Sequence, residues 1–180
     1  LASVGSAGAQ EERIAIPGTP VSLIPPPGFT ASRSERGVEN TGTGSSITIS
    51  EQSGAAYASL AERFSSAKSL TEGYAQQKIT VRGVRRIDGK IPFAIGRQVS
   101  GGKDVAKYFA LLQGDKTVLV TFTIADRAFT EADAEAVMAG FAPRAYPQRA
   151  RPARNRRVRG LLSGRGSEWE PAMADKRERA

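Results

Sequence analysis

The chain has 180 residues, no histidine, no cysteine and a formal net charge of +8. The missing residue types exclude Ser-His-Asp and Cys-His nucleophile systems, thiol redox chemistry, disulfides and the usual zinc and copper sites. The length is that of one domain with a single sizeable core. We therefore expect a protein that is not an enzyme and has no catalytic, cofactor-binding or metal-binding residues.

Residues 1–12 are predicted to be the remnant of a signal peptide followed by a flexible leader. Ala7-Gly8-Ala9 has the small-x-small form of a signal-peptidase site, and cleavage after Ala9 would leave Gln10 first. The alternative is an Ala/Gly/Ser leader that matches this form by chance. A chain without cysteine suits the bacterial periplasm, where disulfides are permitted but not required. No run of apolar residues approaches the length of about 18 that a membrane helix needs. Together with the signal-peptide remnant, the expected location is periplasmic or secreted.

The segment 13–29 is predicted to be extended and interrupted by turns. Its Pro-Gly and Pro-Pro-Pro-Gly runs favour edge strands and turns over a central strand. Residues 41–46, Thr-Gly-Thr-Gly-Ser-Ser, are predicted to form the next turn. A half-buried strand follows at 46–51, where isoleucine alternates with serine and threonine.

A helix is predicted over 55–67. Tyr57, Leu60, Phe64 and Ala67 recur at intervals of three and four residues, which places them on one helix face. We expect this apolar face to pack on the sheet.

Residues 79–124 are predicted to form four antiparallel strands joined by short turns. Asp88-Gly89 supplies residues that tolerate positive φ in a tight hairpin, and Ser100-Gly101-Gly102 ends the second strand. The third strand, 103–113, becomes apolar on both sides, which is typical of a strand covered on both faces of a sheet. The fourth strand, 117–124, shows the clearest alternation of the chain.

The last predicted helix begins at Thr130-Glu131-Ala132-Asp133, which has the form of a capping box. Apolar residues follow on one face, and Pro143 is expected to close the helix. Hairpins between two helices predict an α+β fold with an antiparallel sheet of about five to six strands flanked by helices, an α-β-α sandwich. We expect it to form a single domain over 13–145.

Several sequence patterns resemble those of the PsbP-like superfamily, the PsbP, Mog and DcrB type of α-β-α sandwich. The strongest lie at 16–23, 26–29 and 44–51, and weaker ones at 101–108 and 116–125. The resemblance extends over about 130 residues, 14–143. It implies a binding or assembly module with no known catalytic centre.

Three short features carry candidate chemistry. Ser65-Ser66-Ala67-Lys68 has the S-x-x-K spacing of penicillin-interacting enzymes but lacks the partner motifs, so we interpret it as a surface helix end. Gly42-Thr43-Gly44-Ser45 offers backbone N–H groups to an anion, but it precedes a strand and is interpreted as a turn. Arg82, Arg85 and Arg86 around Gly83 are interpreted as a solvated strand end. The acidic residues are scattered, and whether a pair meets in space stays open.

Residues 146–180 are predicted to be a basic, disordered tail, because they hold too few apolar residues to offset the entropy of ordering. Residues 1–145 carry a net charge of +2 and residues 146–180 carry +6. Arginines without a nearby acid suit phosphate-bearing polymers or anionic surfaces. This candidate anion-binding set consists of Arg149, Arg151, Arg154, Arg156, Arg157 and Arg159.

The function we prefer is a non-catalytic, exported envelope module that binds a protein or small-ligand partner. The alternative is binding of an anionic polymer or surface through the arginine-rich tail. Nucleic acid is disfavoured as the partner, because export would separate the two. A hydrolase that uses Ser65 is the third and least favoured class.

Overall fold

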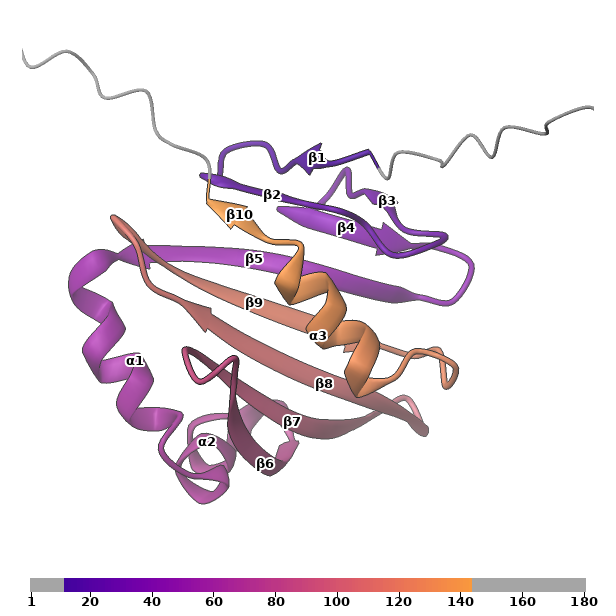
Figure 1. Ribbon diagram of the computed structural model, residues 1–180. Coiled ribbons are helices and arrows are strands. Elements are labelled where there is room, and N and C mark those ends of the chain that lie inside the picture. The colour runs from indigo at the N-terminus through magenta and orange to yellow at the C-terminus, as the bar shows by residue number, and fades with distance from the viewer. Residues whose placement is uncertain (1–11, 144–180) are drawn as a thin grey trace, which may run out of the picture. The chain divides into compact units, whose positions relative to one another are not determined.

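The computed structural model describes residues 12–143, which form an α+β fold built on a large antiparallel sheet (Figure 1). The seven strands of this sheet are, in spatial order, β3 (Thr30–Ala31), β4 (Gly37–Asn40), β5 (Ser45–Ser53), β9 (Lys116–Ile124), β8 (Lys103–Leu112), β7 (Ile91–Ser100) and β6 (Ile79–Ile87). A smaller sheet has the order β1 (Ile14–Ala15), β2 (Val21–Leu23) and β10 (Ala142–Pro143). The predicted fold class is therefore confirmed.

The large sheet has seven strands where the sequence predicted five to six. The additional strands are short and lack apolar alternation: β3 has two residues and β4 has four. Backbone pairing holds them in place, because β4 pairs with β5 through Val38 opposite Ile47, and β3 pairs with β4. Both side chains of that Val–Ile pair are fully buried.

The predicted leader and tail lie outside the described residues, apart from Glu12. The boundaries of the domain predicted over 13–145 therefore stay predictions. The same holds for the candidate anion-binding set of arginines, all of which lie beyond residue 143.

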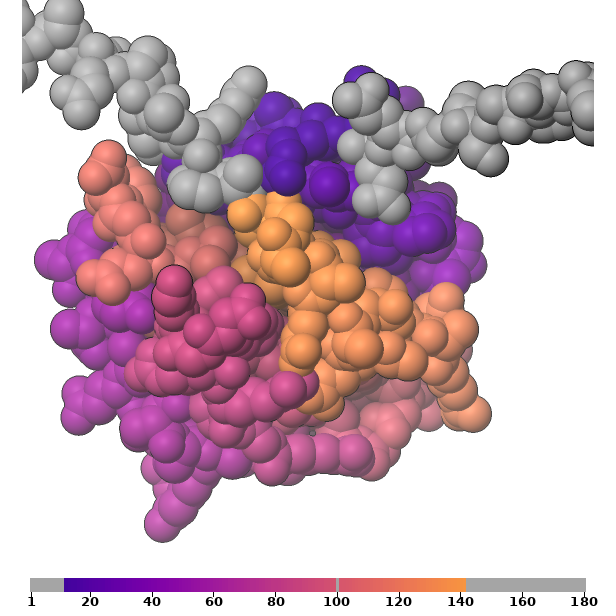
Figure 2. Space-filling model, viewed as in Figure 1, coloured from indigo at the N-terminus to yellow at the C-terminus, as the bar shows by residue number. Residues whose placement is uncertain are grey.

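The helices cover the two faces of the sheet. α1 (Tyr57–Arg63) and α2 (Ala67–Gly73) pack on one face, next to the short 3-10 turns η1 (Gly54–Ala56) and η2 (Ala75–Gln77). α3 (Glu131–Ala139) packs on the other face. In the space-filling view, α3 (orange) lies between the N-terminal strands (indigo) and the hairpin of β6 and β7 (pink) (Figure 2).

The single helix predicted over 55–67 is wrong in its extent. α1 ends at Arg63, and Ser66 begins α2 by accepting a hydrogen bond from the N–H of Ser69 at 3.1 Å. The apolar spacing continues across this break, because Phe64 packs with Leu70 into the same core. Side-chain periodicity alone therefore did not reveal the change of helix.

Two hydrophobic cores lie on opposite faces of the sheet. The larger core, under α3 and the small sheet, contains Phe93 and Phe122, which are both fully buried. The smaller core, under α1 and α2, contains Phe64 and Phe109. Strand β8 contributes to both, because successive side chains of a strand point to opposite faces. This confirms the prediction of a central strand covered on both sides.

The small sheet differs from the extended edge segment that the prolines predicted. β2 lies at its centre, and all three of its residues are buried. Pro143 does not close the last helix: α3 ends at Ala139, and Pro143 belongs to β10, opposite Val21. The guanidinium of Arg13 donates to the carbonyl oxygens of Ser22 (3.3 Å) and Gly140 and so joins the small sheet to the end of α3.

The predicted turns between the long strands are confirmed. Asp88 and Gly89 have φ of 50° and 67°, the left-handed values that a tight hairpin requires. In β6, the pairing with β7 shifts between Val81 and Gly83, so Arg82 is the additional residue of a β-bulge. The interruption seen in the sequence at Gly83 is this bulge.

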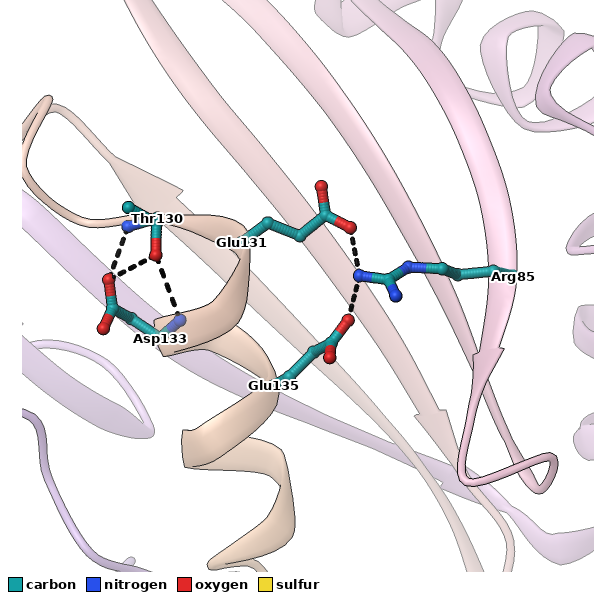
Figure 3. A network of polar contacts seen from close by, with 5 residues as sticks. All are labelled: Arg85, Thr130, Glu131, Asp133 and Glu135. Carbon is teal, nitrogen blue, oxygen red and sulfur yellow. Dashed lines mark hydrogen bonds and ion pairs between the residues drawn. The ribbon is translucent and has the colours of Figure 1, made fainter.

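The predicted capping box at α3 is also confirmed (Figure 3). The hydroxyl of Thr130 accepts a hydrogen bond from the N–H of Asp133 at 3.3 Å, and the Asp133 carboxylate accepts from the N–H of Thr130 at 2.7 Å. The Thr130 hydroxyl also donates to this carboxylate at 2.7 Å. These hydrogen bonds lower the pKa of Asp133 below its ordinary value of 3.8.

Replacement of the capping residues is expected to destabilise the protein in a pH-dependent way. Thr130→Ala should lower the free energy of unfolding by about 1 kcal/mol at pH 7. Asp133→Asn should also destabilise at pH 7. Because the folded state lowers the pKa, the contribution of the carboxylate is present above pH 3.8 and is lost as pH falls through the lowered pKa. Urea unfolding of both proteins across this range tests this, and a difference that does not shrink in acid contradicts it.

Candidate functional site

A cleft with a volume of 470 Å³ lies on the α3 face of the sheet, larger than the second cleft described below. It is bounded by strands β6 to β9 and by the loop 125–130 that leads to α3. Its apolar floor consists of Ile95, Ala106, Tyr108, Ile124 and Phe129. Its charged rim consists of Arg82, Arg97, Asp104, Asp126, Arg127 and Glu131.

Strand alternation and one turn place the floor of the cleft. Tyr108 and Phe122 pair across β8 and β9, so both side chains lie on the face that α3 covers. The carboxylate of Asp126 accepts a hydrogen bond from the N–H of Ala128 at 2.8 Å, and this turn directs the chain so that Phe129 packs on the core. The Phe129 ring centroid is 6.5 Å from that of Tyr108 and 6.4 Å from that of Phe122.

Tyr108 is the most distinctive polar group of the cleft. Most of this residue is buried, with 6% exposed, but its hydroxyl opens on the cleft, and none of the described residues hydrogen-bonds it. Burial raises the pKa of this hydroxyl, and the neighbouring carboxylates of Glu131 and Asp133 raise it further. The hydroxyl therefore stays protonated at neutral pH and is available as a hydrogen-bond donor.

Several rim charges are paired with each other. The Arg97 guanidinium donates to Asp104 from Nε to Oδ1 at 2.9 Å, and a second contact joins its Nη2 to Oδ2. Arg85 lies just outside the cleft and contacts the carboxylates of both Glu131 and Glu135 (Figure 3). It also lies over the ring of Phe93, 5.7 Å from the centroid.

Arg82 and Arg127 remain without an acidic partner within residues 12–143. Both are exposed on the rim. Arg82 is the bulge residue of β6, and bulges commonly redirect a side chain at the border of a site. The arrangement offers two guanidinium groups beside an apolar floor and the unpartnered hydroxyl of Tyr108.

The arginine group that the sequence singled out as a solvated strand end is divided in the structure. Arg82 lines the larger cleft, and Arg85 binds the first turns of α3. The Arg86 guanidinium donates to the carbonyl oxygen of Lys90 at 3.2 Å. All three are exposed, but only Arg82 belongs to the larger cleft.

The S-x-x-K motif does not form a serine–lysine pair among the contacts of the described residues. Ser65 lines the smaller cleft of 330 Å³, beside Phe64 and Val84. Ser66 caps α2, and Lys68 lies 4.0 Å from Glu72 with 87% of its side chain exposed. These positions fit the interpretation as a surface helix end.

The Gly-Thr-Gly-Ser segment forms the turn between β4 and β5. Its N–H groups are already used, because the side-chain oxygen of Asn40 accepts from Gly42 at 3.0 Å and from Thr43 at 3.2 Å. Ser45 is buried, and its hydroxyl accepts from the N–H of Ala125 at 3.1 Å. The segment thus ties β5 to the end of β9, as a structural turn does.

Most acidic residues remain dispersed in the described part of the chain, and the exception is Glu131 and Glu135, whose carboxylates both contact Arg85. Asp88 lies in the hairpin between β6 and β7, and Asp104 pairs with Arg97. Within residues 12–143, no three His, Cys, Asp or Glu side chains are grouped so as to hold a metal ion. Over the same residues, no helix combines the length and the apolar character needed to cross a bilayer.

The sequence did not identify Tyr108, Arg127 or Phe129 as site residues. Tyr108 and Phe129 resemble ordinary core residues in their local pattern, and Arg127 lies in a turn that no sequence pattern indicates. The available signal was Gly83, since a glycine inside a strand pattern indicates a bulge or a close approach. That signal points to Arg82 but not to the rest of the cleft.

No family model matches the sequence, and no curated protein matches it. Among solved structures, the chain is similar to the solution structure of cyanobacterial PsbP (CyanoP) from Synechocystis sp. PCC 6803, with 14% identity and a TM-score of 0.44. The match covers 79% of this chain and 98% of that chain. Membership of the PsbP-like superfamily stays a proposal.

Proposed function

We propose that this protein is a non-catalytic binding module of the bacterial envelope and that the 470 Å³ cleft is its binding site. One observation carries the proposal: the hydroxyl of the otherwise buried Tyr108 opens on this cleft without a hydrogen-bond partner among the described residues. A hydroxyl that opens on a cleft and has no protein partner is available to donate a hydrogen bond to a ligand or an ordered water. An apolar floor with a few convergent polar groups is the usual form of a ligand site.

The proposal that the module is non-catalytic rests on the residue types present. Without histidine and cysteine, the chain lacks the commonest general base and the thiol nucleophile. The remaining nucleophile candidate, Ser65, lies in the other cleft. The cleft at Tyr108 offers hydrogen bonds, charge and apolar contact, which are the requirements of binding.

Export and family membership belong to the same proposal. Export rests on Ala7-Gly8-Ala9, and PsbP-like membership rests on the sequence patterns at 16–23, 26–29 and 44–51. N-terminal mass spectrometry of the protein recovered from a bacterial periplasm tests export. The expected first residue is Gln10, and retention of the preceding residues in a cytoplasmic fraction contradicts the proposal.

Binding is tested by NMR with the full chain labelled with ¹⁵N and four one-ring probes: benzyl alcohol, benzylamine, benzoate and phenyl phosphate. At least one probe is expected to shift the amide signals of Ile95, Tyr108 and Phe129. Tyr108→Phe removes only the hydroxyl and should lower the affinity for that probe a few-fold. Tyr57→Phe, on the other face of the sheet, is the matched control. Shifts confined to other regions, or no shift with any probe, contradict the proposed site.

Catalysis is tested on the same samples. We expect no release of phenol from phenyl phosphate or phenyl acetate above the rate without protein. Hydrolysis that survives extensive purification and falls on Ser65→Ala would contradict the non-catalytic assignment. Ser59→Ala, in α1 just before Ser65 but outside the smaller cleft, is the control.

A second candidate function is favoured by the charge of the predicted tail. Six arginines and no acidic residue lie within 149–159, and such a segment neutralises phosphates with a steep dependence on salt. Deletion of 146–180 distinguishes the two functions. If binding of heparin or lipopolysaccharide disappears on deletion while probe binding in the cleft persists, both functions exist. If probe binding also disappears, the cleft is not the binding site.

A further inference from the structure

We propose that the ligand of the cleft is a small amphiphilic anion, whose carboxylate or phosphate group is bound by Arg82 and Arg127. This inference rests on the proposed function and specifies its ligand. The ligand class follows from a juxtaposition of the two arginines without acidic partners, the apolar floor and the unused donor of Tyr108.

The volume of the cleft favours a small molecule over a protein segment. Clefts of about 300–1,000 Å³ typically bind small molecules, and this cleft has 470 Å³. Five floor residues present apolar atoms, including those of two aromatic rings whose centroids lie 6.5 Å apart. A ligand must therefore bring an apolar body of about one or two rings to fill the floor.

The distribution of ion pairs sets the charge of the ligand. The rim holds three arginines and three acids, so its formal charge does not by itself favour an anion. The pairing of these charges favours an anion, because Asp104 is bound by Arg97 and Glu131 is bound by Arg85. Asp126 uses one carboxylate oxygen for the N–H of Ala128. The cations that retain their full capacity for a ligand are Arg82 and Arg127.

Guanidinium groups suit carboxylate and phosphate because their planar N–H donors bind two oxygens at once. Arg82 comes from a bulge on β6, and Arg127 comes from the loop before α3, so an anion between them would bridge the sheet and the loop. Burial first, and then the carboxylates of Glu131 and Asp133, raise the pKa of the Tyr108 hydroxyl and keep it protonated. It is therefore suited to donate to a neutral ester or ether oxygen of the ligand body, with the anionic end at the arginines.

The test compares the affinities of the four one-ring probes for the full chain at low salt. Phenyl phosphate and benzoate should bind about tenfold tighter than benzyl alcohol, which corresponds to about 1.4 kcal/mol, and benzylamine should bind weakest. The ratio of phenyl phosphate to benzoate distinguishes a phosphate from a carboxylate ligand. Added salt should reduce the affinity for the anions and leave benzyl alcohol unchanged.

Substitutions assign the preference to the two arginines. Arg82→Gln and Arg127→Gln should each lower the affinity for phenyl phosphate about three- to tenfold. The affinity for benzyl alcohol should change less than about twofold. Arg86→Gln is the matched control, because Arg86 lies on the same strand and outside the cleft. Circular dichroism of each variant verifies folding.

The outcomes separate this inference from the proposed function. Equal affinity for phenyl phosphate and benzyl alcohol in the cleft overturns the anion and leaves the binding site in place. An equal loss on Arg86→Gln also overturns the role of the two arginines. Phenyl phosphate that shifts only the signals of 149–159 overturns it as well, because the anion then binds the predicted tail. If no probe reaches the cleft, the proposed function fails with it.

Discussion

Phe122→Ala is expected to lower the free energy of unfolding by about 3–5 kcal/mol, which is a large share of the about 5–15 kcal/mol that stabilises a typical domain. Phe122 is fully buried in the larger core. Its ring lies edge-on to Tyr108, with the centroids 6.1 Å apart, and 6.4 Å from Phe129. Truncation therefore removes a large apolar contact and also leaves a cavity directly beneath the cleft floor.

Urea unfolding followed by circular dichroism measures this loss. The control is Val99→Ala, since Val99 is 60% exposed and its truncation should change stability by less than about 0.5 kcal/mol. Phe122→Leu should restore part of the stability, because it refills part of the cavity. A loss on Phe122→Ala as small as that of the control would show that the core is not packed as described.

Gly37→Ala is expected to destabilise the protein by about 3 kcal/mol, because overpacking at a backbone contact cannot be relieved by rotating a side chain. A Cβ on Gly37 would lie 2.0 Å from the carbonyl oxygen of Ile47 and 3.0 Å from Cα of Thr48. Both are backbone atoms of β5, which pairs with β4 at this point. The substitution must therefore force β4 and β5 apart.

Gly73→Ala provides a matched control for this prediction. Gly73 ends α2, and a Cβ there meets no atom within 4 Å. Alanine in this helical position should be neutral or stabilise the protein by about 0.5–1 kcal/mol. The unfolding temperature should therefore fall for Gly37→Ala and stay the same or rise for Gly73→Ala, and an equal fall for both would contradict the close approach of β4 to β5.

Local interactions explain which parts of the fold could be predicted. The alternation of 117–124 predicted β9. Two residues, Asp88-Gly89, predicted a turn, and the four residues of the capping box predicted the start of α3. The parts that were missed depend on distant partners. β10 exists because Pro143 pairs with Val21, and nothing near Pro143 in the sequence indicates that pairing.

The cleft shows the same limit more strongly. Its floor joins residues of β7, β8, β9 and the loop before α3, so its shape follows from strand order and register. The lack of a partner for the Tyr108 hydroxyl is a result of packing. The sequence pattern shows only that Tyr108 and Phe109 point to opposite faces of a strand. Likewise, the sequence shows the charges of the rim, but only the structure shows which of them are paired.

The central claim, that this cleft binds the ligand, is tested most directly by NMR titration of the ¹⁵N-labelled full chain with phenyl phosphate. The amide signals of Ile95, Tyr108 and Phe129 are expected to shift together and to saturate with one dissociation constant. Arg82→Gln should raise that constant, and Arg86→Gln should leave it unchanged. Saturable shifts located elsewhere in residues 12–143, with the cleft signals unmoved, would contradict the claim.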